Sequence, residues 1–522
     1  MHPTIDRPQN RGILVVDYGS QYTLLITRRL REIGIYAEVV SSLTEAPPED
    51  FTFDGIILSG GPDSVTSEHS RRLPDWALNS DKPILGICYG MQLLVEALGG
   101  EIRSGNKREY GRSTLHLKKS QDHSWLTSLP EDQTVWMSHG DDVHGLEASW
   151  DILGTTDGDV IGLVGHKSRP IYGCQFHPEV QHSENGKELL KNFVVAVCKA
   201  PLNWQSQQRV EAIQKYLSNT VGTGKVLMAV SGGVDSTVAA ALAVKTLGAD
   251  NVTAVFVDNG LLRKNEVAEV KDLFANIGIS NLYVLDREDT FLSKLAGVSD
   301  PEKKRKIIGL TFIEEFEAFA RNHKNEFTHL GQGTLYPDVI ESAGHGAGSK
   351  VIKSHHNVGG LPEHLDLDLV EPFRFLFKDE VRQIGLDIGI PKEFIFRHPF
   401  PGPGLSVRCL GELCKDKLDI LREADHIYIN ALKAQGYYDQ VWQAFAVLIP
   451  VKTVGVMGDN RTYQWTCALR AVTATDGMTA GVGDLPMSFL VKVSDEIVRK
   501  VDGINRVAYD ITTKPPATIE WE

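Results

Sequence analysis

Short apolar segments that end in glycine or polar residues recur along this chain, and they constrain its fold more than any other feature. The first series covers 12–17, 55–58, 83–87 and 171–175, with helical patterns following at 21–33 and 91–98. A second series begins with 226–230 and 252–257, which an alanine-rich helical pattern separates. Strands that alternate with helices predict parallel sheets, which bind ligands at the carboxyl ends of their strands.

The pattern predicts an α/β protein with two doubly wound, mostly parallel-sheet domains and a small α+β C-terminal domain. A length of 522 residues suits three or four domains of about 150 residues each. We expect domains at 1–200, 201–395 and 396–522, because the pattern lapses near 198–208 and again at the proline-rich stretch 398–404. The stretch 341–363, rich in Gly, Ser and His, predicts a lid on the second domain.

Composition excludes several classes of protein. The 54 Lys and Arg residues against 68 Asp and Glu give a net charge of −14, which argues against bulk nucleic-acid binding. The six cysteines show neither a disulfide framework nor zinc-ligand spacing. The N-terminus is polar, and no apolar run reaches about 18 residues. We therefore expect a soluble, cytoplasmic enzyme that binds neither nucleic acid nor membrane.

Cys88 occupies one of the predicted strand ends. The stretch Gly86-Ile87-Cys88-Tyr89-Gly90 follows an apolar strand and precedes a helix, which is the pattern of a nucleophile elbow with cysteine in place of serine. The helix N-terminus favours a thiolate at this position. A free thiol has a pKa of about 8.5 and ionises little at neutral pH, so the predicted nucleophile needs a base.

His177 is the predicted base. It follows strand 171–175, and Glu179 can orient its imidazole, which completes a Cys–His–Glu triad. Backbone N–H groups of Gly60 and Tyr89 would form the oxyanion hole. Most cysteines are buried apolar residues, and Cys174, in mid-strand without a turn, is interpreted that way.

A second turn, Ser231-Gly232-Gly233-Val234-Asp235-Ser236, joins strand 226–230 to the alanine-rich helix. Its glycines let the backbone approach a phosphate, and the helix N-terminus presents unpaired N–H groups to anions. The serine hydroxyls add donors, and Asp235 either holds Mg²⁺ or orients the loop. No Lys-Ser/Thr pair is present, so this is not a Walker loop.

Other polar residues extend this predicted nucleotide site. Gln332 and Gly333 follow a short strand at 327–330, and Lys378 would neutralise departing pyrophosphate. Lys353, His355 and His356 in the lid would close over a substrate, which protects an activated intermediate from water. Two adjacent histidines without a third ligand do not predict a metal site.

These motifs resemble two known families. Residues 12–197 resemble the class I glutamine amidotransferases at 17–21, 59–62, 86–92, 137–141 and 175–179. The resemblance implies hydrolysis of glutamine to glutamate and ammonia through a thioester on Cys88. It implies that the amino-acid end of glutamine is held by Gln92 and by the loop Ser138, His139, Gly140 and Asp141. The string 231–236 resembles the PP-loop of ATP pyrophosphatases, which adenylate a substrate oxygen.

The order of the three parts resembles the glutamine-hydrolysing GMP synthases, most specifically at 398–405 and 506–522. The resemblance implies that glutamine-derived ammonia aminates XMP to GMP through an adenyl-XMP intermediate, with release of AMP and pyrophosphate. It implies Mg²⁺ with ATP and no tightly bound organic cofactor. It also implies a C-terminal part that forms a homodimer and completes the XMP site. Candidate XMP-binding residues there are Arg408, Lys514 and Glu520.

Two other functions remain open. One is a PP-loop amidotransferase or thiolation enzyme with a different acceptor, such as tRNA. The net charge and the glutaminase motifs argue against a tRNA acceptor, because thiolation requires sulfur rather than ammonia. The other is an inactive regulatory module, against which the intact Cys88, His177 and Glu179 argue.

Overall fold

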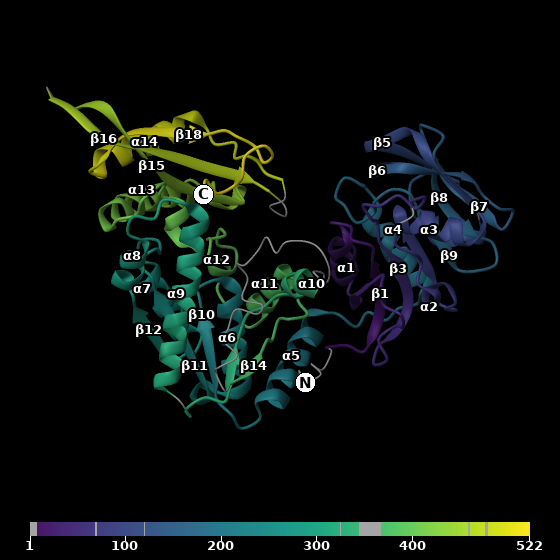
Figure 1. Ribbon diagram of the computed structural model, residues 1–522, viewed down its shortest axis with the longest axis horizontal. Coiled ribbons are helices and arrows are strands. Elements are labelled where there is room, and N and C mark those ends of the chain that lie inside the picture. The colour runs from purple at the N-terminus through teal and green to yellow at the C-terminus, as the bar shows by residue number, and fades with distance from the viewer. Residues whose placement is uncertain are drawn as a thin grey trace. The chain divides into compact units, whose positions relative to one another are not determined.

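The computed structural model describes residues 8–67, 70–118, 121–323, 325–343, 367–457, 460–474 and 479–522. The chain divides into two compact units, which are Met1–Ile213 with Val339–Gly348, and Gln214–Asp338 with Ser349–Glu522 (Figure 1). The domain boundaries expected near 200 and 395 remain predictions. Lys353, His355 and His356 of the predicted lid lie outside the described residues.

A nine-stranded sheet, ordered β2-β1-β3-β4-β9-β8-β7-β5-β6, forms the centre of the first unit. Five neighbouring strands pair in parallel: β2 (Ala37–Ser41), β1 (Arg11–Asp17), β3 (Thr52–Leu58), β4 (Ile84–Ile87) and β9 (Ile171–Cys174). The others are antiparallel: β5 (Glu101–Leu117), β6 (Asp132–Gly145), β7 (Trp150–Thr156) and β8 (Ile161–His166). The parallel half confirms the predicted fold class, whereas the antiparallel half was not predicted.

The parallel strands of this sheet are buried on both faces. Ile13 and Val15 of β1 belong to one apolar cluster and Val16 to another, as alternation along a strand requires. Helices α1 (Thr23–Glu32) and α4 (Gly186–Asn192) contribute to the first cluster. Helix α3 (Tyr89–Ala97) contributes to the second. The loops at the carboxyl ends of the strands are therefore held between two packed layers.

The second unit contains a five-stranded sheet in which every neighbouring pair is parallel. Its order is β12 (Leu282–Asp286), β11 (Val252–Asp258), β10 (Val226–Val230), β13 (His329–Gly331) and β14 (Asp368–Val370). The chain leaves β10 for β11 on one side and later adds β13 on the other side. This makes a topological switch point beside β10, where sheets of this kind bind ligands.

Helices precede and follow these strands along the chain. The first, α5 (Ser206–Val221), begins inside the stretch interpreted from the sequence as a linker, which was therefore drawn too long. Helix α9 (Pro301–Asn322) packs Phe316 and Phe319 against Leu227 of β10 and Val255 of β11. The other helices of this region are α6 (Val234–Leu247), α7 (Glu266–Asn276), α8 (Glu288–Leu295), α10 (Tyr336–Ala343), α11 (Lys378–Asp387) and α12 (Lys392–Ile395).

The C-terminal part of the second unit has a smaller sheet of β15 (Gln443–Met457), β16 (Asn460–Thr473), β17 (Gly481–Val482) and β18 (Ile504–Asp510). Helices α13 (Lys415–Ala434) and α14 (Met487–Lys500) pack against it (Figure 1). One apolar cluster joins Leu261 and Phe291 to Leu421 and Tyr428 of α13. The two sheets of the second unit therefore share a core. None of the described helices is both long and apolar enough to cross a lipid bilayer.

His398 fixes the start of the loop between the two sheets of this unit. Its ring stacks on Tyr438 with centroids 3.7 Å apart. Nδ1 accepts from Ala444 N at 3.2 Å, and Nε2 donates to Tyr438 O at 2.8 Å. A proton on Nδ1 would face the Ala444 N–H, so the ring is held neutral. Burial, with a contribution from the charge of Arg263, lowers the pKa of His398 from 6.5 to about 4.

This pKa predicts a stability that depends on pH. As pH falls, His398 is protonated near pH 6.5 in the unfolded chain but only near pH 4 in the folded protein. The contribution of His398 to the free energy of unfolding is therefore complete above pH 6.5 and is lost as pH falls toward 4. Between pH 7 and pH 5 the free energy of unfolding should fall by about 2 kcal/mol more than in His398→Gln. Urea unfolding of both proteins at the two pH values measures this, and equal pH dependence would contradict it.

Candidate active sites

Cys88 lies at the sharp turn between β4 and α3. Its φ of 52° and ψ of −106° are strained for a residue with a side chain, as a nucleophile elbow requires. Glycine is needed on both sides of the turn. A Cβ on Gly86 would come within 2.5 Å of the Gly90 backbone, and one on Gly90 within 2.6 Å of Leu58 O. The elbow predicted from the sequence is therefore present.

His177 and Glu179 follow β9, which is the neighbour of β4 in the sheet. His177 Nδ1 and Glu179 Oε1 are 2.7 Å apart, and both side chains are buried. Burial opposes protonation of the ring, but the charge of Glu179 and hydrogen bonds to Cys88 and Glu179 raise the pKa of His177 well above its ordinary value. This arrangement suits an imidazole that accepts the Cys88 proton and holds it.

Gly60 follows β3, on the other side of β4. A Cβ added to Gly60 would lie 3.1 Å from His177 Cε1. The Gly60 backbone therefore lies next to the imidazole. Tyr89, the residue after Cys88, is the first residue of α3. These placements bring both predicted oxyanion donors to the elbow. Cys174, interpreted as a core residue, is fully buried in β9, which confirms that interpretation.

The residues predicted to hold glutamine gather on one side of Cys88. Gln92 lies in α3, and Ser138, His139, Gly140 and Asp141 lie within strand β6 rather than in the loop that was expected. Cys88 Sγ is 3.6 Å from Ser138 O, and Gln92 Nε2 donates to Asp141 O at 2.8 Å. The Asp141 side chain accepts from Ser64 Oγ at 2.5 Å. His139 is buried, with Nδ1 3.0 Å from Asp142 Oδ1.

Gln175 is a neighbour of Cys88 that sequence reasoning missed. Its side chain is fully buried, and its Nε2 lies 3.6 Å from Cys88 Sγ. The signal was available, because the motif at 175–179 that contains His177 begins with Gln175.

The turn Ser231–Ser236 lies where it was expected, between β10 and the N-terminus of α6. Gly232 has a φ of 69°, which glycine adopts without strain. Ser236 Oγ accepts from Ser231 N and donates to Gly233 O, both at 3.2 Å. Ser231 Oγ accepts from Gly233 N at 3.3 Å. These bonds hold the turn open around the N-terminus of a 14-residue helix, which attracts anions.

Residues from two other segments meet this turn or lie beside it. Gln332 and Gly333 follow β13, and a Cβ on Gly333 would come within 3.2 Å of Asp235 C and Ser236 N. Lys378, at the start of α11, has Nζ 3.1 Å from Asp235 Oδ2. The sequence-predicted ATP residues therefore lie at the carboxyl edge of the parallel sheet, beside its switch point.

Asp235 retains one carboxylate oxygen that suits a hard cation. Oδ1 is buried, and no donor reaches it among the residues that the structure describes. Mg²⁺ prefers carboxylate and phosphate oxygens, so this donor fits a magnesium ion that arrives with ATP. Over the same described residues, no group of three His, Cys, Asp or Glu side chains forms a metal site.

Arg408 and Glu520 bind each other in the C-terminal part. Arg408 is fully buried, with Nε and Nη2 3.0 and 2.8 Å from the Glu520 carboxylate. Gln443 Nε2 also donates to Glu520 Oε1 at 2.8 Å. The Arg408 guanidinium lies over the rings of Phe400 and Phe445. These contacts hold Nε and Nη2, whereas the buried Nη1 has no hydrogen-bond partner among the described residues, and binding of XMP by Arg408 stays a prediction.

The chain end is docked rather than frayed. Arg470, also fully buried, donates to Ile519 O at 2.8 Å and to Thr518 O at 2.9 Å. Lys304 of α9 donates to Ser406 O and has Nζ 2.5 Å from Glu522 Oε2. Lys304 was not singled out from the sequence, since a lysine in a charged helix start usually faces solvent.

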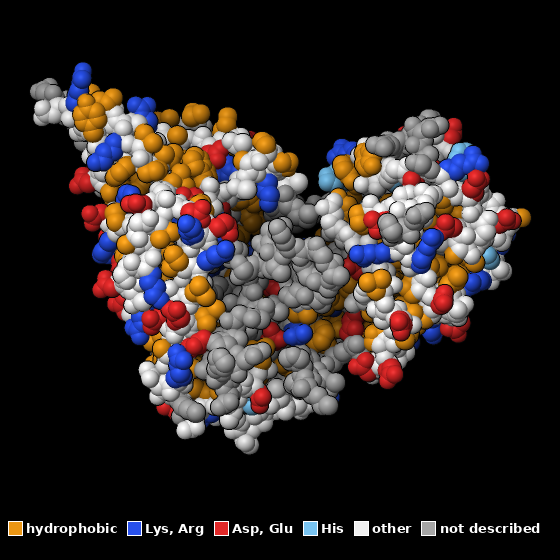
Figure 2. Space-filling model, in the orientation of Figure 1, with side chains coloured by type: hydrophobic (Ala, Val, Ile, Leu, Met, Phe, Trp, Pro, Cys, Tyr) orange, Lys and Arg blue, Asp and Glu red, His pale blue; other side chains and the backbone are white. Residues whose placement is uncertain are grey.

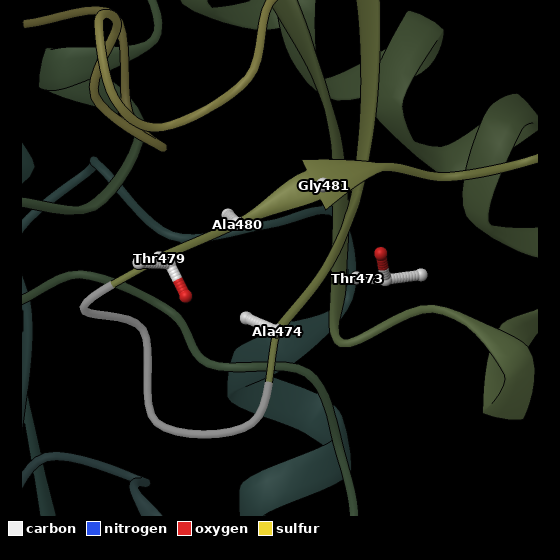
Figure 3. Close-up of a pocket in the computed structure, with 5 residues that line it drawn as sticks. All are labelled: Thr473, Ala474, Thr479, Ala480 and Gly481. Atoms are coloured by element: carbon white, nitrogen blue, oxygen red, sulfur yellow. The ribbon is translucent and has the colours of Figure 1, made fainter. Parts of the chain in front are cut away.

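A pocket of about 450 Å³ lies between β16 and β17, lined by Thr473, Ala474, Thr479, Ala480 and Gly481. Figure 3 shows the side chains of Ala474 and Thr479 on opposite sides of it. Ala480 and Lys514 exchange backbone hydrogen bonds, at 2.9 and 3.0 Å. Lys514, predicted to meet a nucleotide phosphate, is therefore attached to one wall of this pocket.

Three family models match successive parts of the chain. The model described as "Glutamine amidotransferase class-I" matches residues 14–197, and "NAD synthase" matches residues 205–301. The model described as "GMP synthase C terminal domain" matches residues 430–521. The first match contains the elbow, His177 and Glu179, and the second contains the turn at Ser231–Ser236.

Full-length relatives carry one name. Proteins called "GMP synthase [glutamine-hydrolyzing]" from Vibrio vulnificus, Thermotoga maritima and Saccharomyces cerevisiae are 50%, 51% and 52% identical to this chain. Each alignment covers 98% of this chain, and 99%, 100% and 98% of the respective relative. The likeness therefore extends over both units.

Proposed function

The chain belongs to the glutamine-hydrolysing GMP synthase family, and on that premise we propose how its residues carry out the reaction. The protein catalyses the glutamine-dependent, ATP-driven amination of XMP to GMP. The observation that carries the residue assignments is the pair of strand-end sites, one around Cys88 and one around the turn at Ser231–Ser236. One site suits release of ammonia, and the other suits activation of an oxygen by ATP.

Cys88, His177 and Glu179 hydrolyse glutamine. His177 takes the Cys88 proton, and Sγ attacks the side-chain carbonyl of glutamine to form a tetrahedral intermediate whose oxyanion faces the N–H groups of Gly60 and Tyr89. Ammonia leaves with the proton from His177, and a thioester remains. Water, deprotonated by His177, then releases glutamate and returns the electron pair to sulfur. The hydrogen bond between Glu179 and His177 supports the positive charge on the imidazole in both steps.

The turn at Ser231–Ser236, with Gln332 and Gly333 beside it, holds the phosphates of ATP. The backbone N–H groups at the start of α6 bind phosphate oxygens, and Lys378 neutralises the departing pyrophosphate. Asp235 would hold Mg²⁺ through its unpartnered oxygen, and the ion would supply positive charge to the phosphates. The XMP O2 attacks the α-phosphorus and pyrophosphate leaves. Ammonia then attacks C2, and AMP leaves with the former O2.

The acceptor nucleotide binds in the C-terminal part. Lys514 pairs through its backbone with Ala480, which lines the pocket, and its ammonium group would suit a nucleotide phosphate. Glu520, held by Arg408 and Gln443, accepts a hydrogen bond from the base or the ribose. We assign Arg408 the role of orienting that carboxylate.

Isotope transfer tests this scheme. With XMP carrying ¹⁸O at C2, the label should appear in the phosphate of AMP, because the C2–O bond breaks while the P–O bond remains. With glutamine carrying ¹⁵N in its amide, the label should appear in the exocyclic amine of GMP. Retention of ¹⁸O in GMP or in free water, rather than in AMP, would exclude the adenylated intermediate.

The enzyme acts as a homodimer in the cytoplasm. All six cysteines are free thiols, which suits a reducing compartment. One face of the β15–β16 hairpin carries three exposed apolar side chains. They belong to Val454, Val456 and Tyr463, which are 50%, 75% and 62% exposed. Figure 2 shows hydrophobic side chains toward the projecting end of this hairpin. A second copy of the chain would cover them. Sedimentation equilibrium should give twice the chain mass, and a monomer in Tyr463→Lys would identify this face.

A further inference from the structure

Gln175 lies between the nucleophile and the strand that holds glutamine. Its Nε2 is 3.6 Å from Cys88 Sγ, a distance suited to an N–H···S hydrogen bond. Its Oε1 accepts from Gln92 Nε2 at 3.3 Å. Gln92 Nε2 also donates to Asp141 O at 2.8 Å. Two buried amides therefore connect Asp141 of β6 to the sulfur.

The network fixes which end of each amide faces which partner. The Asp141 carbonyl only accepts, so Gln92 must present its NH₂ group to it. The same NH₂ group faces Gln175, which must therefore present its carbonyl oxygen. Rotating the Gln175 amide would place two donors face to face. The NH₂ group of Gln175 consequently points at Cys88 Sγ.

A donor at this position acts on the thiolate more than on the thiol. A thiolate carries a full charge and accepts hydrogen bonds, whereas a thiol also needs an acceptor for its proton. Ser138 O, 3.6 Å from Sγ, can accept from a thiol but offers nothing to a thiolate. Cys88 and Gln175 are both buried, 6% and 0% exposed, so water cannot replace a lost donor.

We propose that Gln175 is a catalytic residue of the glutaminase, which stabilises the Cys88 thiolate through an N–H···S hydrogen bond. The thiolate forms when His177 takes the Cys88 proton, and it forms again when hydrolysis of the thioester returns the electron pair to sulfur. Gln175 stabilises sulfur at both moments. Through Gln92 it also connects the sulfur to the strand that holds glutamine. The role in turnover rests on the glutaminase function proposed above.

Alkylation of Cys88 tests the hydrogen bond without requiring turnover. The rate with iodoacetamide is measured against pH on the peptide that contains Cys88, because the exposed Cys414 also reacts. In Gln175→Leu the pH midpoint should rise by about one unit, which lowers the thiolate fraction at neutral pH about tenfold. Gln175→Glu should raise it at least as far, because it places an anion beside the sulfur. Gln133→Leu, at a buried glutamine of β6 with no assigned role, should leave the midpoint unchanged.

Turnover gives the second readout on the same full-length proteins. In Gln175→Leu, kcat for glutamine hydrolysis should fall roughly tenfold or more, while ammonium-dependent GMP formation stays at the wild-type rate. Retained ammonium use shows that the variant is folded. An alkylation midpoint equal to that of wild type would overturn the proposal, even if kcat falls. If wild type hydrolyses no glutamine, the glutaminase function fails, and the alkylation result still decides the hydrogen bond.

Discussion

Replacing Cys88 with alanine should reduce glutamine-dependent GMP formation by roughly 10⁴-fold or more, because no other group at the elbow can form the thioester. Ammonium-dependent GMP formation should remain within about twofold of wild type, since ammonia supplied from solution bypasses this step. The turn itself should persist, because alanine is no more strained than cysteine at a φ of 52°. Initial rates of GMP formation with glutamine and with ammonium chloride measure the two activities.

Cys198→Ala provides the matched control. Cys198 is also a buried thiol of the first unit, and it follows the helical segment Phe193–Val197 rather than the elbow. Its replacement should leave both activities unchanged. Loss of ammonium use in Cys88→Ala would contradict the assignment of two chemically separate sites, as would retention of glutamine use.

Asp235→Asn should have the second-largest effect. The substitution preserves shape but removes the negative charge that faces Lys378 and that would hold Mg²⁺. GMP formation should fall by roughly 10² to 10³-fold with ammonium as well as with glutamine, because both routes require ATP chemistry at this turn. Basal glutamine hydrolysis, measured as glutamate release without XMP, should survive. The deficit should appear in pyrophosphate release, which identifies adenylation as the impaired step.

Asp289→Asn is the control for this variant. Asp289 is also an aspartate in the first turn of a helix, α8, but it is exposed and follows another strand. Its replacement should leave pyrophosphate release at the wild-type rate. If Asp235→Asn kept amination within a few-fold of wild type, Asp235 would not hold the metal at this site.

Both strand-end sites could be predicted from the sequence because their information is local. Cys88, at the end of β4, and the turn at Ser231–Ser236, at the end of β10, each lie between a short apolar strand and a helix. His177 stands far from Cys88 in sequence, yet parallel strands that end at one edge bring the two together. The geometry of a parallel sheet therefore supplied the missing contact.

Contacts that depend on distant packing were not predictable from one sequence. Arg408 and Glu520 are 112 residues apart, and only the folded chain shows that they bind each other. The antiparallel strands β5 to β8 lack the strand–helix alternation that revealed the rest of the first sheet. Helix α5 was missed although Ile213, Leu217 and Val221 recur at helical spacing and are buried. In that case the signal was present and was not used.

We propose that the second unit transfers an AMP group from ATP to XMP, and that ammonia then displaces AMP. The most direct measurement combines the full-length protein with ATP, Mg²⁺, ammonium chloride and XMP, and follows AMP, pyrophosphate and GMP together. Equal amounts of the three products are expected, and none of them when XMP is omitted. Formation of AMP and pyrophosphate with another acceptor, and no GMP with XMP, would contradict the assignment of the acceptor site.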